Sequence, residues 1–565
     1  MTRSLTAICV ALAAGTSLAQ DTIIVPDDVA SLQDALDPAI SGIDPGDTIV
    51  LRDSLTHFGT FLVTVPDVTI QAAAGDSPVL DANGAGSVIR VDIGNTGDLF
   101  LDGLTIQDGG GVGNSDRGSG IEVDEALRIR VRNCVIRDNN SDSDGGGMFG
   151  ENVSFVIVDS LFLDNTASRD GGAIRNTGDS PVTIRSTQFI DNTASRDGGA
   201  VLYNGNGDRL VQIEDSVFEG NAANDRGGAI HVQNADEFVV DRTTFTANTA
   251  IGKNGSDAGA IFMDTIEDGS IADSEFVGNL ANGEGGAILS LLDTGGGNSV
   301  EYVNTRFEGN EASSSTVALF GGTCDFVNCE FVNNTSLRAG DGSEDGGAIR
   351  YRTTPGGQRA LGSIFNSVFD GNVADRGGAI ALGTATVSIT NSTFVNNAAL
   401  GIGDAVAGLA SATDVTIVNN VFADNGTDPV ELTGGTRVTR FNLFDVNDTI
   451  EGDESDNLFG VNPLFVEAST GDYTLQAGSP AIDAGNSDLY GFGPFADLAG
   501  NLRGQDDPDT ADTGVARTGP VIDMGAFEFN VNSGVAECPA DQNFDGQLTP
   551  ADFTAWVINF NAGCD

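Results

Sequence analysis

Two short motifs recur along this chain at a nearly constant spacing, and this repetition constrains the fold more than any other feature. One is two glycines, an alanine and an aliphatic residue, as at 171–174, and the other is a phenylalanine followed three residues later by an asparagine. A mean step of about 29 residues is typical of a solenoid, in which no single coil can bury its apolar face alone. The phenylalanines are Phe162, Phe189, Phe218, Phe245, Phe276, Phe307, Phe331, Phe369, Phe394 and Phe422.

Within each repeat, the apolar pattern is that of strands. In the segment 182–189, Val182 and Ile184 alternate with Thr183 and Arg185, which is the period of a half-buried strand. Strands stacked coil on coil predict an all-β chain, a parallel β-solenoid, whose phenylalanines stack on one another in the core. The asparagines suit a turn and a ladder of amide hydrogen bonds between coils, and the paired glycines suit a tight corner.

The first 19 residues have the pattern of a secretory signal peptide, with Arg3, an apolar stretch at 5–14 and small residues before an expected cleavage after Ala19. We therefore predict an exported protein, extracellular or associated with a cell surface, without a membrane span. The formal net charge is −56, with 82 acidic residues against 26 basic ones. Such a surface repels nucleic acid and anionic membranes, and its simplest role is solvation in a saline habitat.

Together, the two motifs resemble the polymorphic outer-membrane-protein repeat, which is found on right-handed parallel β-helices of the pectin-lyase type. The resemblance covers about residues 145–425 and implies this fold for residues 20–455. An amphipathic segment that contains Val29, Leu32 and Leu36 resembles the N-terminal cap that shields the first coil of such helices. Some members of the repeat family are adhesins, so the resemblance implies binding to glycans or to other surfaces.

From residue 456 to residue 530 the sequence no longer follows the repeat. This region resembles the choice-of-anchor domains that follow β-helices in surface proteins, and the alternative is that it forms the last coils and a C-terminal cap. An acidic loop in this region could hold calcium, although a solvated loop is the better interpretation. The acidic residues of the loop are Asp506, Asp507, Asp509 and Asp512.

The end of the chain, residues 538–565, follows a linker at 531–537 and contains a calcium-loop motif. Oxygen ligands at positions 1, 3, 5, 7 and 12 of such a loop can enclose one calcium ion, and Gly546 provides the tight turn between them. Cys538 and Cys564 flank the module and are expected to form a disulfide that stabilises it. The expected calcium ligands are Asp541, Asn543, Asp545, Gln547 and Asp552.

This C-terminal module resembles half of a dockerin. The resemblance implies attachment through a cohesin-like or sorting partner, but the dockerins of cellulosomes carry two such repeats and this chain carries one. The helix expected after the loop has an apolar stripe at 553–560, which either docks a partner or forms only a local core.

The sequence of the repeats contains no recognisable catalytic motif. His57 and His231 are the only histidines, and neither belongs to such a motif. The weak catalytic candidates are Asp170, Asp197 and Arg196, which lie in a row of carboxylates and arginines beside the glycine corners. Because the same pairing recurs in distant coils, a structural role explains it better than catalysis does.

We therefore predict a non-catalytic adhesin or glycan-binding scaffold, whose partner is a polysaccharide or the cell-surface matrix and whose tail attaches it. The alternative is a calcium-dependent polysaccharide lyase or glycoside hydrolase of the pectin-lyase-like fold that acts on acidic polysaccharides. A single groove lined by non-repeating aspartates and arginines would favour the enzyme, and uniform flanks would favour the scaffold.

Overall fold

The computed structural model describes most of the chain outside its two ends. The described residues are 20–110, 117–206, 209–252, 255–292, 297–336, 345–410, 413–447, 455–490 and 496–529. The predicted signal peptide, the linker and the dockerin-like tail with its calcium ligands and cysteines all lie outside them.

A typical coil of the solenoid consists of four short strands. β18 (Ile174–Thr177) and β19 (Val182–Arg185) lie on its first side, β20 (Gln188–Ile190) on its second and β21 (Thr193–Ala194) on its third. Buried and accessible residues alternate along β19, because successive side chains of a strand point to opposite faces. The inward side chains of all three sides together form the core of the solenoid.

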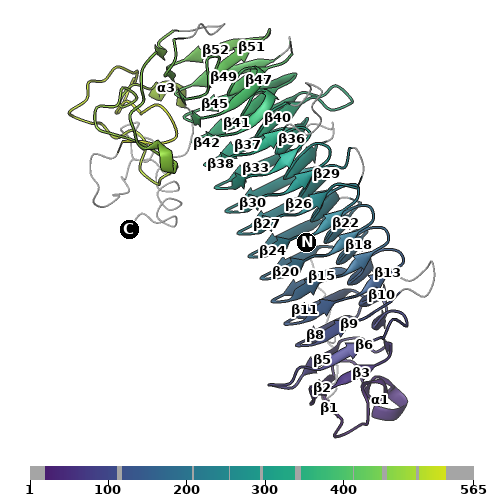
Figure 1. The fold of residues 1–565 in the computed structure, drawn as a ribbon. Helices are drawn as coiled ribbons and strands as arrows, with labels where there is room; N and C mark the ends of the chain where they lie inside the picture. Colours follow the sequence, from purple (N-terminus) through teal and green to yellow (C-terminus); the bar gives the residue numbers. More distant parts are fainter. Residues whose placement is uncertain are drawn as a thin grey trace, which may run out of the picture.

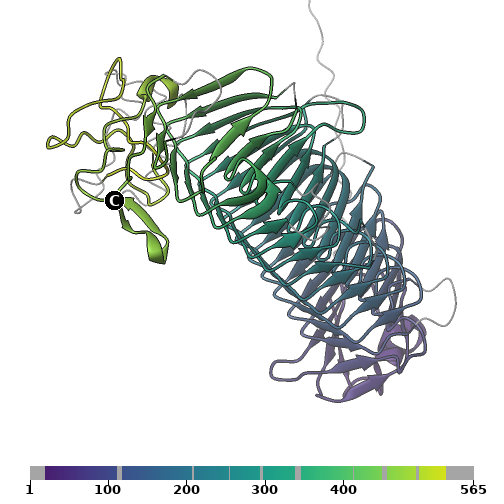
Figure 2. The ribbon, with the colours of Figure 1, turned by 45° about the horizontal axis from the view of Figure 1, so that its top comes forward.

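Each strand pairs in parallel with its counterpart in the next coil, as β18 does with β22 (Val201–Asn204) and β20 with β24 (Val217–Glu219). The described strands of the solenoid form three parallel sheets of 28, 16 and 10 strands. The largest sheet contains two strands per coil, which are continuous in β26 (Ile230–Asp241) and β29 (Ile261–Ala272). Figures 1 and 2 show the coils stacked in sequence order, from the purple end to the green end. The predicted all-β parallel solenoid is confirmed.

Stacked aromatic rings run along the core from Phe162 to Phe459. Neighbouring rings lie 4.7–5.2 Å apart between centroids and are nearly parallel. Offset stacking of this kind adds about 0.5–1.5 kcal/mol per pair to the gain from burial. The ten phenylalanines of the repeat all take part, and the stack continues through Phe444 beyond the recognisable motif.

The asparagines of the repeat form a second buried ladder. In each coil the side-chain amide donates to the side-chain oxygen of the next asparagine, at 2.9–3.0 Å. The same amide also donates to a backbone carbonyl of the preceding coil, as Asn221 does to Phe189. These buried amides are therefore satisfied by their neighbours, and the predicted coil-to-coil bonding is confirmed.

The paired glycines occupy corners where the backbone leaves no room for a side chain. Gly171 has a φ of +64°, in the left-handed region that favours glycine. A Cβ atom on Gly172 would lie 2.1 Å from the carbonyl oxygen of Gly199 in the next coil. The glycines therefore allow the third side of one coil to approach the next closely.

The N-terminal end of the solenoid carries two short helices, α1 (Leu32–Leu36) and α2 (Pro38–Ser41). Ser31 caps α1 by accepting a hydrogen bond from the backbone N–H of Asp34 at 3.1 Å. Leu32, Ala35 and Leu36 of α1 are buried in the core that the first coils share. Within the described parts of the chain, no helix has the length and apolar character that crossing a membrane requires.

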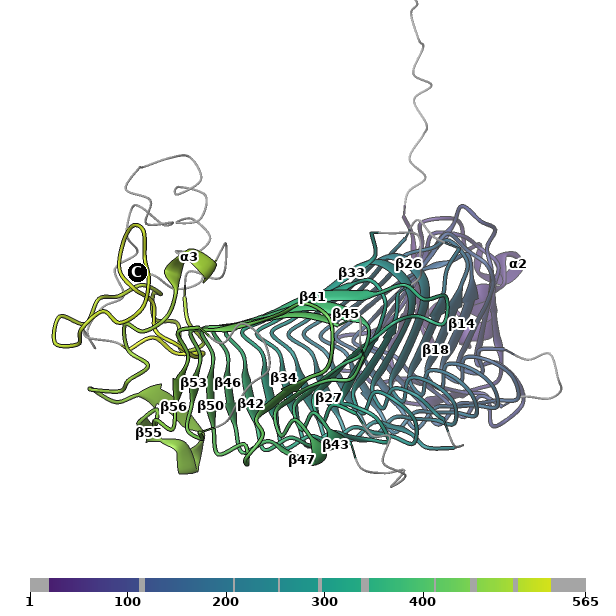
Figure 3. The same ribbon diagram turned by 90° about the horizontal axis from the view of Figure 1, so that it is seen from above.

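Beyond β54 (Leu458–Phe459), the chain leaves the parallel sheets and folds back along the outside of the solenoid. This C-terminal region, residues 460–529, contains the hairpin β55 (Phe465–Glu467) and β56 (Asp472–Leu475), the one-turn 3₁₀ helix η1 (Ala468–Thr470) and α3 (Ser487–Tyr490). It lies beside the outer face of the 16-stranded sheet, near β46 (Thr393–Val395), β50 (Val421–Ala423) and β53 (Leu443–Phe444), as Figure 3 shows.

Apolar contacts and asparagine side chains fasten the C-terminal region to this face. Outward-facing side chains of the sheet, including Val395 and Val421, are buried beneath Tyr473, Ala526 and Met524. Three corner asparagines bond to its backbone: the Asn366 amide donates to Ala496 at 2.8 Å, the Asn391 amide to Asp523 at 2.9 Å and the Asn419 amide to Asn486 at 3.1 Å. The C-terminal region is therefore packed against the solenoid flank.

Candidate functional site

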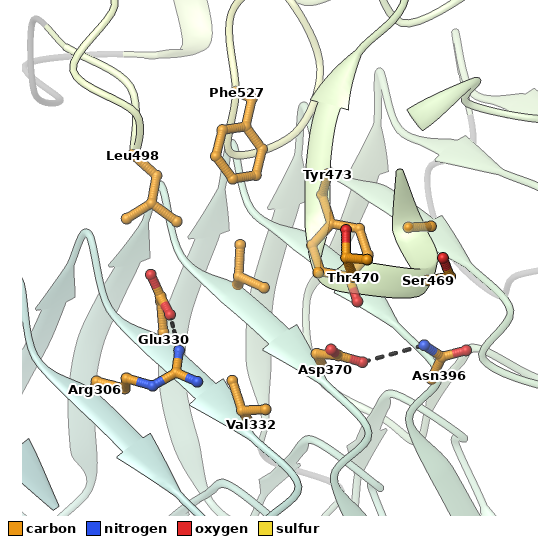
Figure 4. Close-up of a pocket in the computed structure, with 13 residues that line it drawn as sticks. Arg306, Glu330, Val332, Asp370, Asn396, Ser469, Thr470, Tyr473, Leu498 and Phe527 are labelled. Atoms are coloured by element: carbon orange, nitrogen blue, oxygen red, sulfur yellow. Dashed lines mark hydrogen bonds and ion pairs between the residues drawn. The ribbon is translucent and has the colours of Figure 1, made fainter. Parts of the chain in front are cut away.

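A cleft of about 440 Å³ lies where the edge of the C-terminal region meets the solenoid flank (Figure 4). The polar side of the cleft is formed by the outer face of three strands, β34 (Arg306–Glu308), β38 (Glu330–Val332) and β42 (Val368–Asp370). Asn396, the residue after β46, also belongs to this side. The other side of the cleft is formed by η1, β56 and two later loops of the C-terminal region. The lining residues are Arg306, Glu330, Val332, Val368, Asp370, Asn396, Ala468, Ser469, Thr470, Gly471, Tyr473, Leu498 and Phe527.

The strand register places the polar side chains of the cleft in neighbouring coils. Arg306 pairs with Glu330, and Glu330 with Val368, while Asp370 lies in the adjacent outward row beside Val332. The Arg306 guanidinium forms ion pairs with Glu330 and, at 3.0 Å, with Glu308. Because two carboxylates hold this guanidinium, its charge is already balanced before any ligand binds.

Asp370 lies near the centre of the cleft, between the solenoid and the C-terminal region. Its carboxylate accepts a hydrogen bond from the Asn396 amide at 3.2 Å. Arg306 is the only cationic side chain among the described lining residues, which also include the carboxylates of Glu330 and Asp370. The cleft therefore carries a net negative charge.

The opposite wall is aromatic and aliphatic. Tyr473 is 3% exposed, and burial, followed by the nearby Asp370 carboxylate, raises the pKa of Tyr473 above its usual value. Phe527 and Leu498 are half-buried and face the polar side chains across the cleft, as Figure 4 shows. A neutral tyrosine, an accessible phenyl ring and several polar groups thus converge on one space.

The weak catalytic candidates lie elsewhere, at the glycine corners between the third and first sides of the coils. Asp170 is 2% exposed, and its carboxylate binds Arg196 at 2.5 and 2.9 Å and Arg175 at 3.2 Å. Arg175 also binds Asp144 of the preceding coil at 2.6 Å. These contacts join successive coils, so the geometry of Asp170 and Arg196 is that of a structural ion-pair network.

Asp197 differs from the other carboxylates of this row. Its carboxylate lies 3.7 Å from the Nδ1 atom of His231, and burial, followed by the charge of Asp170, raises the pKa of Asp197 to about 6. Burial also lowers the pKa of His231 to about 3, so this ring is neutral. His231 is 4% exposed on the outer face of β26, whereas the side chain of Asp197, at the corner, is 19% exposed.

The register of this row places residues of opposite charge beside one another in several successive coils. The residue that follows Asp197 in the next coil is Arg226, not Asp225, and Arg226 in turn pairs with Asp257. Likewise Arg376, not Asp375, is the neighbour of Asp345, to which it is bonded at 2.6 Å. The row therefore alternates in sign along part of its length, and this alternation relieves the repulsion between stacked carboxylates.

The sequence analysis did not identify the cleft, because Tyr473, Leu498 and Phe527 belong to no motif. The outward-facing residues beneath the C-terminal region include Val368, Val395 and Val421, but apolar residues such as Leu161 and Leu163 also face outward in an earlier coil. These residues alone therefore do not show which part of the sheet is covered or by which segment.

In a comparison with known protein families, part of the chain matches a family model. The model for the family described as "Right handed beta helix region" matches residues 89–245. This segment extends from β7 (Ile89–Asp92) to β27 (Thr244–Thr246) and thus covers the earlier coils of the solenoid. No curated protein is found to match the chain.

Solved structures similar to this chain include three polysaccharide lyases. An alginate lyase from Paenibacillus sp. str. FPU-7 is 15% identical, with a TM-score of 0.25 over 65% of this chain and 93% of that one. A PL6 alginate lyase in complex with a trisaccharide is 14% identical and has a TM-score of 0.38, and the match covers 81% of this chain and 92% of the lyase. The pectate lyase Pel9A is 13% identical and has a TM-score of 0.20, and the match covers 91% of this chain and 98% of the lyase. These values are too low to transfer a substrate or a catalytic residue to this chain.

Proposed function

We propose that this protein is an exported, surface-associated solenoid that binds a glycan without cleaving it, and that the cleft beside Phe527 is its binding site. The observation that carries the proposal is the pairing of the half-buried Phe527 ring with the polar side chains of Asp370 and Asn396. Sugar rings present apolar C–H faces and hydroxyl groups. The C–H faces pack on aromatic rings, and the hydroxyl groups form hydrogen bonds with carboxylates and amides.

The charges of the cleft favour neutral or amino sugars over uronic acids. An acidic polysaccharide needs an uncommitted cation, but Arg306 is already held by Glu308 and Glu330. The carboxylate of Asp370 adds further negative charge. These charges argue against a lyase for acidic polysaccharides at this cleft, because such an enzyme must neutralise the uronate carboxylate.

A hydrolase is the second candidate, and one observation favours it. Glu330 and Asp370 both line the cleft, and a pair of carboxylates is the usual machinery for glycoside hydrolysis. We favour binding because Glu330 is engaged with Arg306 and Asp370 with Asn396, so neither is poised as a free acid or base.

Attachment to the surface rests on the sequence of the tail. We propose that residues 538–565 fold around calcium and bind a cohesin-like or sorting partner, and that the amphipathic N-terminal segment, including α1, shields the open first coil. In this arrangement the solenoid presents the cleft while the tail holds the protein in place.

The proposal is tested by incubating the full chain, with calcium, on a panel of insoluble neutral, amino-sugar and acidic polysaccharides. Retention and chain shortening are measured together. Retention on a neutral or amino-sugar polymer without shortening is the expected result. Shortening that is lost in Glu330→Gln or Asp370→Asn would establish the hydrolase, and the absence of retention on every polymer would overturn glycan binding.

A further inference from the structure

Three carboxylates from separate segments of the C-terminal region converge on one point. One carboxylate oxygen each from Asp483, Asp506 and Asp512 lies within 4.8 Å of the other two. Asp506 and Asp512 are exposed on the acidic loop, whereas Asp483 is 0% exposed and comes from the segment before α3. The sequence alone did not connect Asp483 with this loop.

The buried carboxylate of Asp483 is incompletely satisfied. Its Oδ2 atom accepts a hydrogen bond from the backbone N–H of Asp507 at 3.2 Å. Its Oδ1 atom is buried and has no hydrogen-bond partner among the described residues. A buried carboxylate oxygen without a donor is costly, so this atom indicates a missing positive partner at the convergence point.

The surrounding core has too few cations for its acids. Arg503 is the only buried cation among the described residues of the C-terminal region, and it is bonded to Glu528 at 3.2 Å. A buried negative charge is normally paired with a cation or coordinates a metal. The carboxyl side chains that are at most 5% exposed in this region are Asp483, Asp497, Asp507, Asp523 and Glu528.

We infer that Asp483, Asp506 and Asp512 form a calcium site, distinct from the calcium loop predicted at 541–552. All three ligands offer oxygen, which calcium prefers, whereas zinc prefers histidine and cysteine. Two of the ligands lie on a loop, and calcium tolerates such flexible geometry and fills its remaining positions with backbone oxygens and water, whereas magnesium demands a near-ideal octahedron.

Calcium at this point would connect the acidic loop to the part of the C-terminal region that holds the solenoid. The backbone N–H of Asp483 donates to the Asp523 carboxylate at 2.7 Å, and the backbone carbonyl of Asp523 accepts the Asn391 amide of the solenoid. Binding is therefore expected to stabilise the packing of the whole region, including the wall of the cleft.

The test uses the full chain with Asp541→Asn and Asp545→Asn, which silence the predicted tail loop. After removal of metal with a chelator, calcium is titrated by calorimetry at constant ionic strength, with magnesium as the comparison ion. We expect one calcium per chain and at least tenfold weaker binding of magnesium.

Adding Asp506→Asn and Asp512→Asn should abolish this binding, and both positions are exposed, so the fold should persist. The matched control is Asp509→Asn, an exposed carboxylate of the same loop, which should bind as before. The inference is overturned if the silenced chain takes up no calcium, if the double variant still binds it, or if magnesium binds equally well. Calcium should also slow proteolysis within residues 460–529, and the double variant should lose this protection.

Discussion

The side-chain amide of Asn221 donates a 3.0 Å hydrogen bond to the side-chain oxygen of Asn248, one coil further on, and both side chains are fully buried. The same oxygen also accepts the backbone N–H of Asn221 at 3.0 Å. Asn248 in turn donates to Asn279. Each asparagine therefore satisfies groups in two neighbouring coils, which fixes both the corner and the register of stacking.

Replacing one member of this ladder should destabilise the coils around it. In Asn248→Ala, the backbone N–H of Asn221 loses its acceptor, the Asn221 amide loses one of its two acceptors, and the carbonyl of Phe218 loses a donor. Each unsatisfied buried group costs about 1–3 kcal/mol. We expect a loss of several kcal/mol, measured as faster amide hydrogen exchange in the coils that contain residues 221–279.

The matched control for this substitution is Asn224→Ala, which removes an exposed asparagine in a neighbouring part of the same coils. Its exchange rates should stay close to those of the wild type. Equal exchange in both variants would mean that the buried ladder does not hold the coils in register.

The stability of the solenoid should depend on pH through Asp197. Its pKa of about 6 in the folded protein exceeds the value of about 3.9 expected for an unfolded chain, so the folded state binds the proton more tightly. The protonated carboxyl therefore contributes stability that is fully present below about pH 4 and is lost as the pH rises through about 6.

In Asp197→Asn this contribution no longer titrates. The melting temperature of the wild type, relative to that of Asp197→Asn, should fall as the pH rises from about 4 to about 7 and should then stay constant. A constant difference for Asp197→Asn across the range would contradict the effect of burial on this group.

The C-terminal region should depend on Arg503. Its guanidinium is 3% exposed, binds Glu528 and donates to the side-chain oxygen of Asn366 at 2.8 Å on the solenoid. Arg503→Met leaves Glu528 buried without its charge partner, which costs about 3–5 kcal/mol. Limited proteolysis should then cleave within residues 460–529 while the solenoid stays intact.

Arg517→Met provides the control for this experiment, because the side chain of Arg517 is 87% exposed and its partner is Asp488 at the surface. It should be as resistant to proteolysis as the wild type. If Arg503→Met is equally resistant, the buried ion pair does not hold the C-terminal region in place.

The solenoid could be predicted from the sequence because its core positions repeat. Phe245 and Asn248 recur with the same spacing in coil after coil, and a repeated side chain must meet its own copies when coils stack in parallel. The register of the charged row could not be predicted, because Asp225 and Arg226 are consecutive and only the backbone pairing decides which of them lies beside Asp197.

The cleft and the Asp483 cluster could not be predicted in the same way. Phe527 and Asp370 line the same cleft only because the C-terminal region folds back along the flank, and no periodic signal fixes where a non-repeating segment packs. Asp483 likewise approaches Asp506 and Asp512 through the packing of three loops. The signal peptide and the calcium loop at 541–552 stay predictions from the sequence.

The most direct test of glycan binding at the cleft is the affinity of Phe527→Ala for the insoluble polysaccharide that retains the wild-type protein, measured as a binding isotherm by depletion of the protein from solution. Loss of a stacking ring should weaken binding by about tenfold, which corresponds to about 1.4 kcal/mol. Phe58→Ala, which removes a 71%-exposed ring on β3 (Thr56–Phe58) near the other end of the solenoid, should bind as the wild type does. Unchanged affinity in Phe527→Ala would contradict the assignment of the cleft as the glycan site.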